Sequence, residues 1–336
     1  MRRRISLCSA IALIASTVGI VVAGPVAAST PIAYSGRGIA FSGTVAGTPA
    51  GFADTLSLPS TGGNQDAEMI SVGVPGLLGG ASLHASTIGQ SDRTRTEASV
   101  GAVSITAGSD SIQADFAMSR AMAVSSHGAP VLGGSSEVSN LVVNGVAVAV
   151  TGQVNQIVPL PDGQLIVNER LTSSSGATGS ITINALHVTL ADTTDLLVSS
   201  SRAGVTAGSS NCSSGTQPTS GGGWIATPSG GKGTFGVTGR ATASGGFLGH
   251  VVYTDHATGT KIRGPVTFYQ QFGTNSVLEG PAQVNGQPAG NFRVDVQDNG
   301  EPGNSDSFAI STTGLPPYAA GGRVEGGNIQ IHKPCR

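Results

Sequence analysis

Charged side chains are scarce in this chain. Only 11% of its 336 residues are Asp, Glu, Lys or Arg, and lysine occurs only at Lys232, Lys261 and Lys333. No basic stripe is present, and neutralising nucleic-acid phosphates requires clustered Lys and Arg. The composition therefore argues against a nucleic-acid-binding protein.

Aromatic residues are also few, at 4%, and Trp224 is the only tryptophan. Glycine, in contrast, occurs 51 times, far above its average frequency. Such a composition suits many short strands joined by tight turns, with disorder as the alternative. Apolar residues alternate with polar ones along much of the chain, which favours strands over disorder. We therefore expect an all-β protein.

The N-terminus has the pattern of a cleavable secretory signal. Arg2, Arg3 and Arg4 precede an apolar run over residues 5–22, and small residues at 26–28 predict cleavage after Ala28. An uncleaved anchor helix is the alternative, because the run is nearly long enough to span a bilayer. Gly24-Pro25 would break such a helix and favours cleavage. The cleaved chain would have about 308 residues and a net charge of −5, with no stable membrane span.

Cysteine is rare, and only Cys212 and Cys335 follow the predicted signal. In an exported protein two cysteines most simply form one disulfide. Closing so long a loop would contribute about 4–5 kcal/mol in the chain-entropy model. Two free thiols are the alternative.

Composition divides the chain into two units. Residues 30–207 are rich in Ser, Thr, Ala and Val, and residues 208–222 resemble a flexible polar linker. Residues 223–334 form a second unit with recurring turn signals. We expect two antiparallel β-sandwich-like domains joined by the Gly/Ser-rich linker.

Several turns and strands can be placed directly. Asn144-Gly145 and Pro161-Asp162-Gly163 each predict a hairpin. Residues 181–190 predict a long strand that is covered on both faces. The one helix predicted is short and lies near residues 76–88, despite its Gly79-Gly80 pair.

In the second unit, strands are expected at seven places. They are residues 233–237, 247–254, 264–272, 277–284, 290–297, 307–311 and 326–332.

The densest cluster of carboxylates lies within residues 295–306. Asp295, Asp298, Glu301 and Asp306 fall within twelve positions of a chain that has few charges. Together with Asn299 or Asn304 they resemble a set of oxygen ligands for Ca²⁺, although the spacing is not that of an EF-hand. Asp, Asn, Gly and Pro are also the residues of an ordinary long hairpin loop. Both interpretations stay open, since the flanking residues alternate as strands in either case.

No catalytic motif is complete. No His pair has the spacing of a zinc site, since His250 and His256 would lie about 20 Å apart on a strand. Gly179-Ser180 and Gly133-Gly134-Ser135 approach a nucleophile turn without completing it. Asp192 and Asp195 lie in an ordinary turn sequence. The sequence therefore predicts no catalytic residue and no cofactor other than the calcium alternative.

Four segments of the first unit carry a family resemblance. They are residues 136–145 (Ser-Glu-Val-Ser-Asn-Leu-Val-Val-Asn-Gly), Val154-Asn155, 163–169 (Gly-Gln-Leu-Ile-Val-Asn-Glu) and 181–188 (Ile-Thr-Ile-Asn-Ala-Leu-His-Val). Together they resemble bacterial choice-of-anchor P family proteins over most of residues 34–207.

The second unit resembles the module that often follows choice-of-anchor domains. This similarity is carried by residues 222–224, 233–236 and 295–308. The resemblance implies an exported protein of unknown biochemical role. Members usually carry a C-terminal sorting signal, whereas this chain ends Ile-Gln-Ile-His-Lys-Pro-Cys-Arg, which favours release or non-covalent association with the envelope.

These features favour a secreted, non-catalytic protein with a structural or surface-binding role. Its expected partners are cell-surface or matrix polysaccharide or protein. The alternative is a secreted hydrolase or glycan-active enzyme whose site is built from distant loops. Two carboxylates about 5–10 Å apart in a cleft would favour that alternative.

Overall fold

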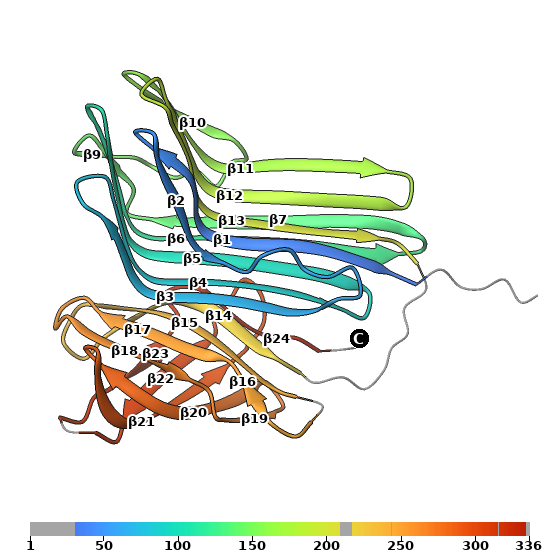
Figure 1. The fold of residues 1–336 in the computed structure, drawn as a ribbon, viewed down its shortest axis with the longest axis vertical. Helices are drawn as coiled ribbons and strands as arrows, with labels where there is room; N and C mark the ends of the chain where they lie inside the picture. The colour runs from blue at the N-terminus through green and yellow to red at the C-terminus, as the bar shows by residue number, and fades with distance from the viewer. Residues whose placement is uncertain (1–30, 209–216, 243, 315, 334–336) are drawn as a thin grey trace, which may run out of the picture.

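The fold consists of β-strands without a helix in the residues described by the computed structural model, which are 31–208, 217–242, 244–314 and 316–333. The strands form three antiparallel sheets (Figure 1). The predicted all-β class is confirmed. The predicted signal peptide and both cysteines of the predicted disulfide, Cys212 and Cys335, lie outside the described residues.

Two of the sheets come from the first part of the chain. The six-stranded sheet has the order β10 (Gln156–Leu160), β11 (Gly163–Ser175), β12 (Thr178–Leu190), β13 (Thr194–Thr206), β1 (Ala33–Val45) and β2 (Thr48–Asp54). The seven-stranded sheet has the order β3 (Gly63–Val74), β4 (Leu78–Gln90), β5 (Arg93–Ala107), β6 (Asp110–Ser126), β8 (Val142–Val143) and β9 (Val146–Ala147), with β7 (Ala129–Ser139) also paired to β6.

The remaining strands form one eleven-stranded sheet. Its order is β23 (Ala319–Arg323), β22 (Ser307–Thr312), β21 (Gln287–Gln297), β20 (Asn275–Val284), β18 (Thr260–Pro265), β17 (His250–Asp255), β15 (Lys232–Ala241), β14 (Thr219–Ala226) and β24 (Gly326–Ile331). Two short strands lie beside this path, β16 (Phe247–Leu248) on β15 and β19 (Phe268–Phe272) on β20.

The turn signals place the hairpins correctly. Val143 pairs with Val146 across Asn144-Gly145, and both turn residues have positive φ, at 50° and 76°. These values match the type I′ turn that Asn-Gly favours. Leu160 likewise pairs with Gly163 across Pro161-Asp162. Local turn chemistry therefore fixes these reversals.

The predicted helix near residues 76–88 is wrong, because this segment forms a hairpin turn and β4. Gly76 has a φ of 73° in the turn, and β4 then pairs with β3 on one side and β5 on the other. Most of β4 is buried on both faces, so its apolar residues do not follow a simple alternation. A central strand of this kind cannot be distinguished from a buried helix by periodicity alone.

The long strands of the two N-terminal sheets are sharply bent (Figure 1). At the bend, Ser82, Ala102 and Ser199 have φ values of 49°, 49° and 51°, and the register between β4 and β5 shifts on both sides of Ala81. A residue with positive φ inside a strand is typical of a β-bulge, which bends the strand and increases its twist. The bend divides each sheet into two segments. Two separate hydrophobic clusters contain buried residues from both sheets.

Small hydroxyl side chains hold the two N-terminal sheets together. Ser119 Oγ lies 2.7 Å from Ser201 Oγ on the opposite sheet, and Thr94 Oγ1 donates to the Gly204 carbonyl at 2.8 Å. A Cβ added at Gly36 would stand 2.6 Å from Thr87 Cγ2 on the opposite sheet. The abundance of Gly, Ser and Thr thus has a packing role, because larger side chains would not fit between these sheets.

The eleven-stranded sheet curls over a core of its own. The alternation predicted on β21 and β22 is confirmed, since Phe292, Val294, Val296, Phe308 and Ile310 are all buried in this core. The strands do not split into the two separate sheets expected of a sandwich. Strong curling allows a single sheet to enclose its own hydrophobic cluster.

The end of the predicted linker is strand instead of coil. Residues 219–222 belong to β14, are buried, and pair with β15 and β24. Glycine-rich sequence resembles a linker, yet here it is needed because β14 lies against the seven-stranded sheet. A Cβ at Gly222 would stand 2.3 Å from Ser99 Oγ, and one at Gly236 would stand 2.5 Å from the His84 Cβ.

These glycines form a narrow seam between the two parts of the chain. Ser82 Oγ also donates to Thr254 Oγ1 at 2.9 Å across it. In Figure 1, β14 and β15 lie directly below β3 and β4. The parts therefore meet through small polar residues, while their hydrophobic cores stay separate.

Candidate functional site

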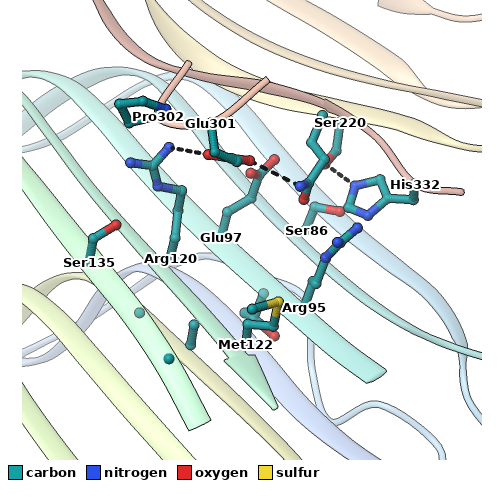
Figure 2. A pocket seen from close by; sticks show the side chains of 15 residues that line it. Ser86, Arg95, Glu97, Arg120, Met122, Ser135, Ser220, Glu301, Pro302 and His332 are labelled. Carbon is teal, nitrogen blue, oxygen red and sulfur yellow. Dashed lines mark hydrogen bonds and ion pairs between the residues drawn. The ribbon is translucent and has the colours of Figure 1, made fainter. Parts of the chain in front are cut away.

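A cavity of about 470 Å³ opens beside this seam. It lies between β5, β6 and β7 on one side and β14, β24 and the loop after β21 on the other (Figure 2). Its lining residues are Ser86, Arg95, Thr96, Glu97, Arg120, Ala121, Met122, Gly133, Gly134, Ser135, Ser220, Glu301, Pro302, Gln330 and His332. The volume falls within the range of small-molecule sites, about 300–1,000 Å³.

The floor of the cavity is set by strand geometry. Arg95 and Glu97 are two residues apart on β5, so their side chains project from the same face of the sheet. Their cross-strand neighbours on β6 are Met122 and Arg120. The antiparallel register thus places two guanidinium groups and one carboxylate together.

The opposite wall comes from the C-terminal part of the chain. Ser220 lies on β14, Gln330 on β24, and His332 directly after β24. The loop between β21 and β22 adds Glu301, whose Oε2 lies 3.5 Å from Arg120 Nη1. This ion pair joins the two walls across the cavity.

Glu97 is the buried charge of the site. Its Oε1 lies 3.4 Å from His84 Nε2. Burial alone raises the pKa of the carboxyl, but hydrogen bonding and charge from His84 lower it, and a hydrogen bond from Ser220 lowers it further. The resulting pKa lies below the ordinary value of Glu, so Glu97 is ionised at neutral pH.

His332 is buried and uncharged. Desolvation, and then the nearby Arg95 charge, lower its pKa to about 3. Its Nε2 lies 2.8 Å from Ser220 Oγ, whereas its Nδ1 has no hydrogen-bond partner. A buried nitrogen without a partner at a cavity wall marks a position for a ligand or water to contact.

The four acidic residues predicted as calcium ligands do not converge. Asp295 pairs with Arg293, while Asp298 accepts from the Ile331 amide at 2.8 Å. Glu301 lies on the cavity wall. Asp306 is fully buried and accepts from backbone amides on the loop and on β24. No group of three or more His, Cys, Asp or Glu side chains placed to hold a metal occurs in the described ranges.

This arrangement favours the hairpin-loop interpretation, in which the carboxylates fasten the loop to β24. We therefore expect millimolar Ca²⁺ to leave the midpoint of thermal unfolding unchanged. A ligand that binds only the folded state must raise the midpoint by mass action. The measurement is calorimetry of the full chain with Ca²⁺ and with excess chelator. A reproducible rise with Ca²⁺ would restore the cation site, and Mg²⁺ serves as the control ion.

The buried Asp306 carboxyl predicts a pH effect on stability. Burial raises its pKa from 3.8 to about 6, and the charges of Asp298 and Glu301 act in the same direction. Because the folded state binds this proton more tightly than the unfolded state, the stability contribution is fully present below about pH 4. It is lost as the pH rises through about 6.

We expect Asp306→Asn to remove this pH dependence of the free energy of unfolding. The measurement is the free energy of unfolding in denaturant at several pH values between about 4 and 7, for wild type and variant. The difference in free energy of unfolding between wild type and Asp306→Asn should change between about pH 4 and 7. For the exposed control Asp295→Asn, the difference from wild type should stay constant. A constant difference for Asp306→Asn would contradict the assignment.

Sequence patterns missed the cavity residues, although one signal was present. Residues 93–97 read Arg-Thr-Arg-Thr-Glu, a rare alternation of charge and threonine in this chain. That alternation places three charges on one face of a strand. Nothing local connects them to Ser220 or His332.

Ser135, which belongs to one of the incomplete nucleophile turns, does reach the cavity. Figure 2 places it on the opposite side from His332, so the two do not form a nucleophile and base pair. Gly179-Ser180, the other incomplete turn, lies on β12 and not at the cavity.

A second polar cluster lies away from the cavity on the six-stranded sheet. His187 Nδ1 lies 3.0 Å from Glu169 Oε2, and its Nε2 lies 2.9 Å from Asp195 Oδ1. Burial lowers the pKa of His187, but the two carboxylates outweigh it and raise the pKa above its ordinary value. Asp192 stays in its turn and accepts from the Thr194 amide at 3.1 Å. Both ring nitrogens of His187 are therefore occupied by carboxylates.

The described part of the chain contains no helix with the length and hydrophobicity needed to cross a membrane. Comparison with family models, with curated proteins and with solved structures gives no match to this chain. The resemblance to choice-of-anchor P proteins thus stays a prediction from the sequence.

Proposed function

We propose that this chain is an exported, non-catalytic binding protein whose cavity holds a small polar ligand. The export signal and the family resemblance support a role at the cell surface or in the surrounding matrix. The observation that carries the proposal is the cavity itself. It combines a volume suited to a small molecule with a few convergent charged and polar groups that can orient a ligand.

A glycan-active enzyme is the second candidate, because Glu97 and Glu301 line the same cavity. Glycoside hydrolysis generally needs one carboxyl that is protonated and can act as an acid. Glu97 has a lowered pKa, and Glu301 accepts hydrogen bonds from Asn328 at 3.2 Å and Gln330 at 3.0 Å. Both carboxylates therefore act as hydrogen-bond acceptors, which favours binding over hydrolysis.

The proposal is tested by blocking the cavity. Gly133 lines the cavity, and a Cβ built there has no atom within 4 Å, so Gly133→Trp should fill it without disturbing the sheet. Gly51→Trp on β2 is the matched control, since its Cβ position is equally open.

Ligand-observed NMR with a panel of monosaccharides, sugar acids and hydroxy acids should detect binders of the wild type. Their signals should vanish with Gly133→Trp and persist with Gly51→Trp. If ligands still bind the Gly133→Trp variant, the binding surface lies outside the cavity and the proposal is wrong. The sugars of this panel, presented as aryl glycosides, test the enzymatic alternative, and we expect no release of the aryl group.

A further inference from the structure

The hydrogen-bonding capacity that is left in the cavity is unevenly distributed. Glu301 uses Oε1 for Asn328 and Gln330 and has Oε2 facing Arg120. Glu97 interacts with His84 and Ser220. The carboxylates thus already have protein donors, so a ligand gains little from offering them more.

Arg120, in contrast, still has donors to offer. Its guanidinium carries five N–H groups, and the contact of Nη1 with the Glu301 carboxylate is long, at 3.5 Å. Arg95 adds a second guanidinium on the neighbouring strand. Arginine forks match the geometry of a carboxylate and bind it through paired, charge-assisted hydrogen bonds.

His332 adds an acceptor beside these donors. Ser220 Oγ lies between Glu97, which can only accept a hydrogen bond, and His332 Nε2. If Ser220 donates to Glu97, Nε2 must carry the proton and donate to Ser220. Because the ring is neutral, Nδ1 then carries a lone pair. This is the nitrogen without a partner, and in Figure 2 it lies on the side of Arg95.

A ligand that fits this wall needs a carboxylate for the Arg120 guanidinium and a hydroxyl that can donate to His332 Nδ1. We propose, on the basis of the binding function above, that the cavity of this protein recognises an acidic sugar of the uronate class. Such a ligand arises as a free sugar or as the end of an acidic polysaccharide chain. The Pro302 and Met122 side chains provide the apolar contacts for the sugar ring.

Titration calorimetry of the full chain with D-galacturonate, D-galactose and tri-galacturonate tests the inference. The acid should bind at least about tenfold more tightly than the neutral sugar, as one charge-assisted hydrogen bond requires. Its affinity should also fall with added salt, whereas that of galactose should not. Tighter binding of the trimer than of the monomer identifies the polysaccharide end as the source, and equal binding identifies the free sugar.

Two variants locate the contacts. Arg120→Gln should reduce the preference for the acid to about threefold or less, while Arg293→Gln, on an exposed pair elsewhere, should keep it. His332→Gln keeps a polar group near the Nε2 position but none near Nδ1, so it should weaken the binding of both sugars. His332→Asn places a polar group near the Nδ1 position and should weaken sugar binding less. If Arg120→Gln does not fold, the salt dependence of binding to the wild type tests the inference instead. An affinity for galacturonate that does not fall with added salt would overturn it.

The outcomes separate the two proposals. Equal binding of galactose and galacturonate would overturn the uronate assignment and leave the cavity as a binding site. Binding of neither sugar, when the NMR panel finds another cavity ligand, would overturn the uronate assignment alone. An empty panel would overturn both.

Discussion

Replacing Glu97 with alanine lowers the free energy of unfolding by about 3–5 kcal/mol, the usual cost of removing one partner from a buried pair. Glu97 is 6% exposed, and its partner His84 is 1% exposed. In the variant, His84 stays buried against Gly236 without its hydrogen-bond acceptor. The variant also removes the carboxylate that accepts a hydrogen bond from Ser220.

Chemical denaturation of wild type and variant measures this loss, and Glu279→Ala is the control. Glu279 pairs with Arg293 at 2.8 Å, but both side chains are exposed, so its removal should cost about 1 kcal/mol or less. Equal losses for the two variants would show that the buried Glu97–His84 pair stabilises the protein no more than an exposed pair does.

The second large effect is expected from Phe308→Ala, at about 3–5 kcal/mol. The Phe308 ring stacks on Phe235 with centroids 4.0 Å apart, and Tyr253 lies 6.0 Å away. Aromatic residues are rare in this chain, so few other side chains can fill the space inside the curled sheet. The alanine variant leaves a cavity between β15 and β22.

Thermal and denaturant unfolding of Phe308→Ala should show the loss, and Phe272→Ala is its matched control. Phe272 is 51% exposed at the end of β19, so its truncation should change stability by about 0.5 kcal/mol or less. A small effect of Phe308→Ala would contradict the assignment of this stack as the centre of the C-terminal core.

Local patterns predicted the parts of the fold that short-range physics decides. Asn144-Gly145 specifies a hairpin because both residues tolerate positive φ. The alternation of Phe292, Val294 and Val296 fixes the inward face of β21 before any partner strand is known. Both features depend only on neighbours in the sequence.

The errors arose where distant strands decide the outcome. Residues 219–222 look like linker, but their glycines are required because β14 passes close to Ser99 and to β24. Residues 78–90 lack clean alternation because β4 is covered on both faces. The strand predicted over residues 264–272 is interrupted, since β18 ends at Pro265 and β19 begins at Phe268.

The candidate site escaped prediction for the same reason. Glu97 and His332 lie in one cavity but are separated by most of the chain, and neither belongs to a local motif. The acidic segment at residues 295–306 is conspicuous in the sequence because it holds four carboxylates in a chain with few charges. Of its four carboxylates, only Glu301 lines the cavity, while Asp298 and Asp306 fasten the loop to β24.

The central claim is that the cavity between the two parts of the chain is a ligand site. A crystal structure of the full chain soaked with D-galacturonate tests it most directly. We predict ligand density inside the cavity, with a carboxylate within hydrogen-bonding distance of Arg120 and a hydroxyl at His332 Nδ1. A ligand bound outside the cavity, or a cavity that holds only water at saturating sugar, would contradict the account.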